Sequence, residues 1–124
     1  AKMVPFGGYD MPVQYPTGIL TEHKHTRAEA GLFDVSHMGE FVVIGTEQLN
    51  RMFTNDLRKL AVGQGQYTLM LNERGGVIDD LIIYRIADAE FLLVVNAAKI
   101  DEDFAWLSPR VPSGVKAIAV TGVA

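Results

Sequence analysis

Residues 72–84 read Asn72-Glu73-Arg74-Gly75-Gly76-Val77-Ile78-Asp79-Asp80-Leu81-Ile82-Ile83-Tyr84, and this stretch decides how the middle of the chain folds. The Gly-Gly pair predicts a turn that enters an apolar strand. Two adjacent aspartates lie inside that strand, although aspartate is depleted in strands because it prefers turns. Two interpretations remain open. Either one carboxylate accepts from a nearby backbone donor while the other is solvated, or one of them belongs to a functional site.

The residues on both sides extend this stretch into an antiparallel meander. Strands are predicted over 66–72, 77–86 and 91–96, joined by short links. A loop at 73–76 places Leu71 opposite Ile78, Leu69 opposite Asp80, and Tyr67 opposite Ile82. In the second hairpin, the same reasoning places Ile86 opposite Phe91, Tyr84 opposite Leu93, and Ile82 opposite Val95.

Alternation of side chains separates the two aspartates. Asp79 and Asp80 point to opposite faces of the strand, so they cannot form a paired-carboxylate dyad. The predicted register gives the Asp80 face an apolar and aromatic wall. Its members are Tyr67, Leu69, Ile82, Tyr84, Leu93 and Val95. The aliphatic members are what an ordinary hydrophobic core contains. One carboxylate with two tyrosines is instead typical of a pocket for a flat, partly polar heterocycle.

The remaining segments place this meander in an α+β fold. We expect an irregular segment over 1–17 with an extended piece at 11–15, and a helix over 18–30 that Thr17 caps. Strands are predicted over 32–35, 39–44 and 116–120, and helices over 46–53 and 99–107. The predicted class is therefore α+β, with an antiparallel β-meander or Greek-key sheet, flanking helices, and a single domain over 1–124.

Composition excludes several classes of function. A net charge of −4 over 124 residues gives no basic surface for nucleic acid or an anionic membrane. No apolar run approaches the ~18 residues that a membrane span requires. Cysteine is absent, which excludes disulfides and thiol nucleophiles. His23 and His25 lack the spacing of helical metal ligands, so no metal site is predicted. His37 is either a structural hydrogen-bonding residue or a residue at a pocket edge.

Several motifs, in order along the chain, resemble the aminomethyltransferase (T-protein) family of the glycine cleavage system. They are Met11-Pro12-Val13-Gln14-Tyr15, Gly31-Leu32-Phe33-Asp34-Val35-Ser36-His37-Met38-Gly39-Glu40, Tyr67-Thr68-Leu69-Met70-Leu71-Asn72, Gly75-Gly76-Val77-Ile78-Asp79-Asp80-Leu81-Ile82 and Val94-Val95-Asn96-Ala97-Ala98. The likeness runs from the start of the chain to about Leu107. It favours the T-protein over the folate domains of dimethylglycine- and sarcosine-oxidising enzymes.

The resemblance implies a reaction and a set of site residues. The family moves a methylene group from an aminomethyl-dihydrolipoyl arm on the H-protein to tetrahydrofolate, with release of ammonia. Asp80 matches the family's catalytic carboxylate, which orients folate and stabilises an iminium-like transition state as the carbon–sulfur bond breaks. The implied folate-binding positions are Met38, Tyr67, Asp80, Tyr84, Val95 and Asn96.

Family members continue beyond residue 124, so we expect this chain to be an N-terminal fragment with an incomplete pocket, inactive alone. Exposed apolar surface on such a fragment favours homo-oligomers. The resemblance implies a cytoplasmic location in bacteria or the mitochondrial matrix in eukaryotes. Two alternatives remain open. One is a non-catalytic folate-binding module of the same superfamily, related to iron–sulfur assembly scaffolds, and the other is a truncated structural product.

Overall fold

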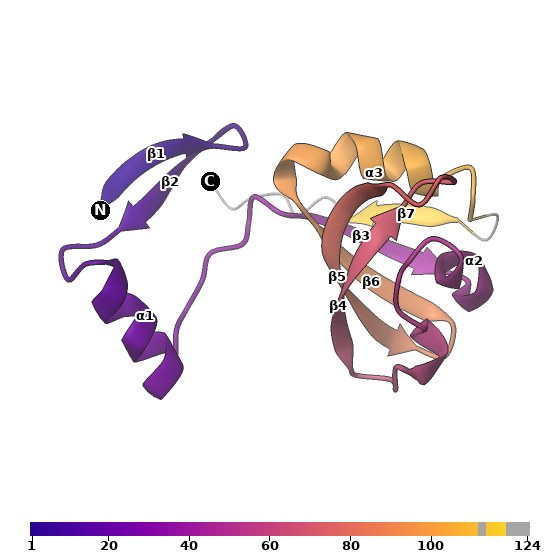
Figure 1. Ribbon diagram of the computed structural model, residues 1–124, viewed down its shortest axis with the longest axis horizontal. Helices are drawn as coiled ribbons and strands as arrows, with labels where there is room; N and C mark the ends of the chain where they lie inside the picture. Colours follow the sequence, from indigo (N-terminus) through magenta and orange to yellow (C-terminus); the bar gives the residue numbers. More distant parts are fainter. Residues whose placement is uncertain (112–113, 119–124) are drawn as a thin grey trace. The chain divides into compact units, whose positions relative to one another are not determined.

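The computed structural model describes residues 1–111 and 114–118. The chain divides into two compact units, Ala1–His37 and Met38–Ala124, here called the N-terminal unit and the sheet unit. Each unit has its own strands and helices (Figure 1). The expectation of one domain over the whole chain therefore stays a prediction.

The N-terminal unit consists of a β-hairpin and a helix. Strands β1 (Lys2–Phe6) and β2 (Tyr9–Gln14) pair antiparallel, and α1 covers Ile19–Ala28. The extended piece predicted over 11–15 largely coincides with β2, but the prediction of an irregular segment around it was wrong, because β1 and β2 form a hairpin. Prolines argue against central strands, but a two-stranded ribbon has only edges, where proline is tolerated. Gly7 and Gly8 make the turn, with φ of 56° and 87°.

Two other predictions in this unit need correction. The strand predicted over 32–35 is absent, since those residues form no ladder, and Leu32 is fully exposed. Thr17 does not cap α1, because the N-cap position is Gly18. None of residues 1–37 is buried, so this unit has no hydrophobic core of its own.

The sheet unit is built on five antiparallel strands in the order β4-β5-β6-β3-β7. They are β3 (Gly39–Ile44), β4 (Gly65–Leu71), β5 (Val77–Ala87), β6 (Glu90–Val95) and β7 (Val115–Ile118). The meander β4-β5-β6 returns next to β3, which is a Greek-key arrangement. The predicted α+β class is confirmed. The last two residues of the strand predicted over 116–120 lie outside the described residues.

Short helices connect and cover the strands. They are α2 (Thr46–Asn50), the 3₁₀ turns η1 (Leu57–Lys59) and η2 (Ala97–Lys99), and α3 (Ile100–Leu107). Helix α2 ends three residues earlier than the predicted 46–53. Figure 1 shows α3 lying along the sheet, and Leu107 of this helix belongs to the same buried cluster as Phe41, Leu93 and Val95. In the described residues, no helix is long and apolar enough to cross a bilayer.

The first hairpin has the predicted register over most of its length. Leu69 pairs with Asp80 and Tyr67 pairs with Ile82, as expected. The predicted pairing of Leu71 with Ile78 is wrong, because an irregularity beside the turn pairs Leu71 with Val77 instead.

The second hairpin differs from its predicted register by one residue. Ala87 pairs with Glu90 at the turn, but Arg85 pairs with Phe91, so Ile86 is the extra residue of a β-bulge. Beyond the bulge, Tyr84 pairs with Leu92 and Ile82 with Val94. A slip of one residue exchanges the faces of every following side chain.

The sheet unit therefore has a buried core face and an open face. Leu93 and Val95, predicted beside Asp80, are both 0% exposed on the core face. Their neighbours Leu92 and Val94 are half-buried and replace them on the open face, with Asp80. The core face carries Phe41, Val43, Met70, Leu81, Ile83, Phe91, Leu93 and Val95, together with Asp79.

Candidate functional site

Asp80 lies on the open face and is held by the neighbouring strand. The Tyr67 hydroxyl on β4 donates a hydrogen bond of 2.6 Å to Oδ2 of Asp80 on β5. The two residues are diagonal neighbours, since Tyr67 pairs with Ile82 and Asp80 pairs with Leu69. The carboxylate stabilises the neutral phenol that donates to it, and so raises the pKa of Tyr67. Both side chains are exposed, so a bound molecule can reach them.

Tyr84 extends this face along β5, beyond Ile82. Its cross-strand partner is Gly65, and a Cβ at that position would collide with the Tyr84 ring. The ring therefore lies over a position that only glycine leaves free. Tyr84 is 38% exposed and Ile82 is 39% exposed, which leaves a flat aromatic and aliphatic surface beside the carboxylate.

Asn96 joins the site from the end of β6. Its Nδ2 donates to the main-chain carbonyl of Asp80 at 2.8 Å and to Oδ1 of Asp79 at 2.9 Å. The Asn96 main-chain N–H donates to Oδ2 of Asp79 at 3.3 Å. Asn96 is thus a bridge between the aspartate that faces the core and the aspartate that faces the open side.

Asp79 has the opposite environment from Asp80. It is 6% exposed and lies on the core face, opposite Asp80 as strand alternation predicted. Its neighbour is Asp103 of α3, which is 0% exposed. Burial, followed by the contact with Asp79, raises the pKa of Asp103 to about 8.

Sequence reasoning missed Asp103, which lies within the helix predicted over 99–107. The available signal was its position. Ile100, Asp103 and Leu107 follow helical spacing on the side of α3 that meets the core.

The two remaining predicted site residues differ in placement. Met38 directly precedes β3, and the register of Gly39 with Val95, extended by one residue, places Met38 across from Asn96. Val95 is buried on the core face, so the prediction that it lies on the same face of the sheet as Asp80 is wrong. Its predicted contact with folate now rests on the resemblance alone.

His37 lies in the N-terminal unit. Its ring lies edge-on to those of Phe6 and Tyr9, with centroids 6.2 Å apart in each pair. It lines a cleft of about 610 Å³ within that unit. In the described residues, no three His, Cys, Asp or Glu side chains gather as a metal site would require.

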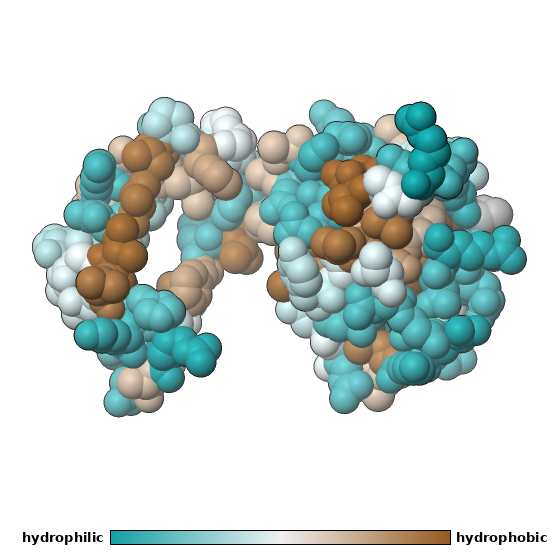
Figure 2. All heavy atoms as spheres, in the orientation of Figure 1, coloured by the Kyte–Doolittle hydropathy of each residue, from teal (hydrophilic) through white to brown (hydrophobic). Residues whose placement is uncertain are grey.

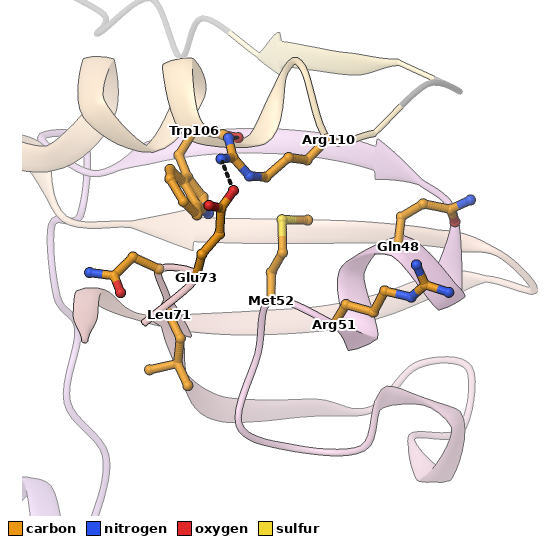
Figure 3. Close-up of a pocket in the computed structure, with 8 residues that line it drawn as sticks. Gln48, Arg51, Met52, Leu71, Glu73, Trp106 and Arg110 are labelled. Carbon is orange, nitrogen blue, oxygen red and sulfur yellow. Dashed lines mark hydrogen bonds and ion pairs between the residues drawn. The ribbon is translucent and has the colours of Figure 1, made fainter. Parts of the chain in front are cut away.

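A separate cleft of about 290 Å³ lies beside α3 in the sheet unit (Figure 3). Arg110 stacks on Trp106, with its guanidinium carbon 3.3 Å from the ring centroid, and pairs with Glu73 at 2.9 Å. These contacts already satisfy the Arg110 charge. Asp80, Tyr67 and Tyr84 do not line this cleft.

Comparison with known proteins agrees with this geometry. The family model described as the GCVT N-terminal domain matches residues 1–124. The aminomethyltransferase of Chlorobaculum tepidum is 58% identical over 114 residues, which cover 90% of this chain and 31% of the relative. That of Anoxybacillus flavithermus is 52% identical over 124 residues, which cover 98% of this chain and 34% of the relative.

A solved structure gives the same result. The glycine cleavage system aminomethyltransferase T from Bartonella henselae superposes with a TM-score of 0.82 at 45% identity, covering 96% of this chain and 35% of that one. This chain spans about a third of the length of the relatives it matches. Both the sequence motifs and the fold show that the chain belongs to the GCVT N-terminal domain family.

Proposed function

We propose that the open face of the sheet unit is the folate-facing wall of an aminomethyltransferase, and that Asp80 is its catalytic carboxylate. The hydrogen bond from Tyr67 to Asp80 is the observation that carries this proposal. It fixes an exposed carboxylate beside aromatic surface, in a chain whose relatives are named aminomethyltransferases. A flat, partly polar pterin ring suits such a surface.

In the proposed reaction, the methylene carbon leaves the sulfur of the dihydrolipoyl arm and becomes bonded to tetrahydrofolate as ammonia departs. Positive charge develops on that carbon while the carbon–sulfur bond breaks. Asp80 supplies a fixed negative charge for it, and Tyr67 and Asn96 hold the Asp80 segment in place. The lipoylated H-protein is the proposed partner, and the bacterial relatives support a cytoplasmic location.

Calorimetric titration of tetrahydrofolate tests the binding part of this proposal. The samples are this chain and a hybrid in which it replaces the matching third of the Bartonella henselae protein, with the unmodified parent as control. We expect the hybrid to bind with an affinity close to that of the parent. This chain should bind far more weakly, because it spans only about a third of its relatives. A hybrid that folds but does not bind, beside a parent that does, would overturn the proposal.

A further inference from the structure

The carboxyl group of Asp103 is unusual because it is buried and no described residue donates a hydrogen bond to it. The residue is 0% exposed, and among the described residues neither of its oxygens accepts a hydrogen bond. An ionised carboxylate in such a place is strongly disfavoured. The helix that carries it, α3, also contributes Leu107 to the main core cluster, and Asp103 is buried on the same helix.

A proton on Asp103 resolves the difficulty, because its neighbour Asp79 is an acceptor. Asp79 is the neighbour that, after burial, most favours the neutral form of Asp103. Two like charges side by side in the interior disfavour each other, which favours a proton on one of the two groups. The other charged groups that act on Asp103 are Glu102 of α3, which also favours the neutral form, and Lys99 of η2, which opposes it.

The hydrogen bonds of Asp79 distinguish its surroundings from those of Asp103. Both Asp79 oxygens accept from Asn96, one from the side-chain amide and one from the main-chain N–H. Donors to both oxygens stabilise a carboxylate. No described residue donates to Asp103 in this way, which favours the proton on Asp103.

These contacts form a continuous path from the core to the open face. Asp103 neighbours Asp79, Asp79 accepts from Asn96, and Nδ2 of Asn96 donates to the carbonyl of Asp80 at 2.8 Å. The exposed end of the path is the carboxylate that Tyr67 holds.

We propose that Asp103 is a positioning residue: its carboxyl proton completes a buried acid pair with Asp79, and that pair fixes Asn96 against Asp80. Only the last link, from Asp80 to a ligand, rests on the proposed function. Loss of the proton leaves two negative charges in the core, which separates the pair and loosens the hold of Asp79 on Asn96.

Carbon and nitrogen NMR of this chain, titrated with acid and base, tests the pair without any variant. The side-chain carboxyl carbon of Asp103 should titrate with a midpoint near the pKa of about 8, far above the ordinary 3.8. The side-chain amide of Asn96 and the main-chain carbonyl of Asp80 should shift with the same midpoint. An Asp103 midpoint at or below 3.8, or an Asn96 amide that does not follow Asp103, would overturn the proposal.

Two variants of Asp103 and one control separate positioning from general packing. Asp103→Asn keeps a donor toward Asp79 and removes the titration, so the Asn96 resonance should stay at its low-pH position at every pH. Asp103→Leu removes the donor, and the Asn96 side-chain amide should lose its protection from hydrogen exchange. Asp101→Asn, at an exposed position on the same helix, should behave as the unmodified chain does. An Asn96 resonance that moves equally in all three variants would contradict the path.

Tetrahydrofolate titrations of the hybrid protein and of its Asp103→Asn variant, at pH values below and above that midpoint, form a separate arm. The hybrid should lose affinity at the higher pH, and its Asp103→Asn variant should not. If neither binds tetrahydrofolate beside a parent that does, the proposed function fails, while the NMR midpoints still decide whether the acid pair exists. If binding is present but independent of pH in both samples, the link from the pair to Asp80 is wrong.

Discussion

The hydroxyl of Tyr67 donates a 2.6 Å hydrogen bond to Oδ2 of Asp80 from the neighbouring strand. On the other side of the same strand, Asp79 faces the core and accepts from Asn96. The two adjacent aspartates thus have different environments, because strand alternation directs one to the solvent and the other to the interior.

Because Tyr67 donates to Asp80, the pKa of Tyr67 reports whether this hydrogen bond forms in solution. The neighbouring carboxylate stabilises the phenol and repels the phenolate, so Tyr67 should titrate above its ordinary pKa of 10.0. In Asp80→Asn the midpoint should return toward 10.0. NMR of the Tyr67 ring carbon that carries the hydroxyl follows both titrations. Equal midpoints in the two proteins would show that the hydrogen bond does not form in solution.

The position of Tyr84 depends on the missing side chain at Gly65. Gly65→Ala should destabilise the sheet unit by about 1 kcal/mol or more, because the new methyl group meets the Tyr84 ring. The loss should shrink in a Tyr84→Ala background, where the ring is gone. Urea unfolding of the four proteins gives the coupling energy, which we expect to lie at about 0.5–3 kcal/mol. Independent, additive effects would mean that the ring does not lie over Gly65.

The corrected register of the second hairpin predicts opposite outcomes for two adjacent leucines. Leu93→Ala should cost about 2–5 kcal/mol, because Leu93 is fully buried in the core cluster. Leu92→Ala should cost about 1 kcal/mol, because Leu92 is half-buried on the open face. Urea unfolding of both variants compares them directly. A larger loss for Leu92 would restore the register that the sequence suggested.

Titration of Asp103 also makes the stability of the chain depend on pH. Its pKa of about 8 in the folded chain lies above the ordinary 3.8, so the folded state binds more protons between these values. The contribution of Asp103 is therefore complete below pH 3.8 and is lost as the pH rises through about 8. The free energy of unfolding of Asp103→Asn, measured in urea over this range, should lack that decline. An equal decline in both proteins would assign it to other groups.

The sequence was sufficient to predict the neighbours of Asp80 in the first hairpin. There the turn at Gly75 and Gly76 and the alternation of side chains placed Tyr67 beside Asp80. The irregularity next to the turn leaves the register at Leu69 and Asp80 unchanged.

The sequence was insufficient where an extra residue or a tertiary contact decides the outcome. The bulge at Ile86 has no local signal in an apolar run, and it moved Leu93 and Val95 to the core face. Asp103 resembled an ordinary acid at a helix start, because only the packed sheet reveals Asp79 next to it. The β1–β2 hairpin was missed because Pro5 and Pro12 argue against strands in general, although not against a two-stranded ribbon.

The rate of aminomethyl transfer to tetrahydrofolate by the hybrid protein tests the central role of Asp80 most directly. Asp80→Asn keeps the shape of the side chain and removes its charge, while Asp101→Asn makes the same change at an exposed position on α3. We predict that Asp80→Asn lowers the rate by roughly 10²–10³-fold, in the range found when one stabilising group of an active site is removed. Asp101→Asn should leave the rate unchanged. An Asp80→Asn hybrid that transfers the group as fast as the Asp101→Asn hybrid would contradict the assignment of Asp80 as the catalytic carboxylate.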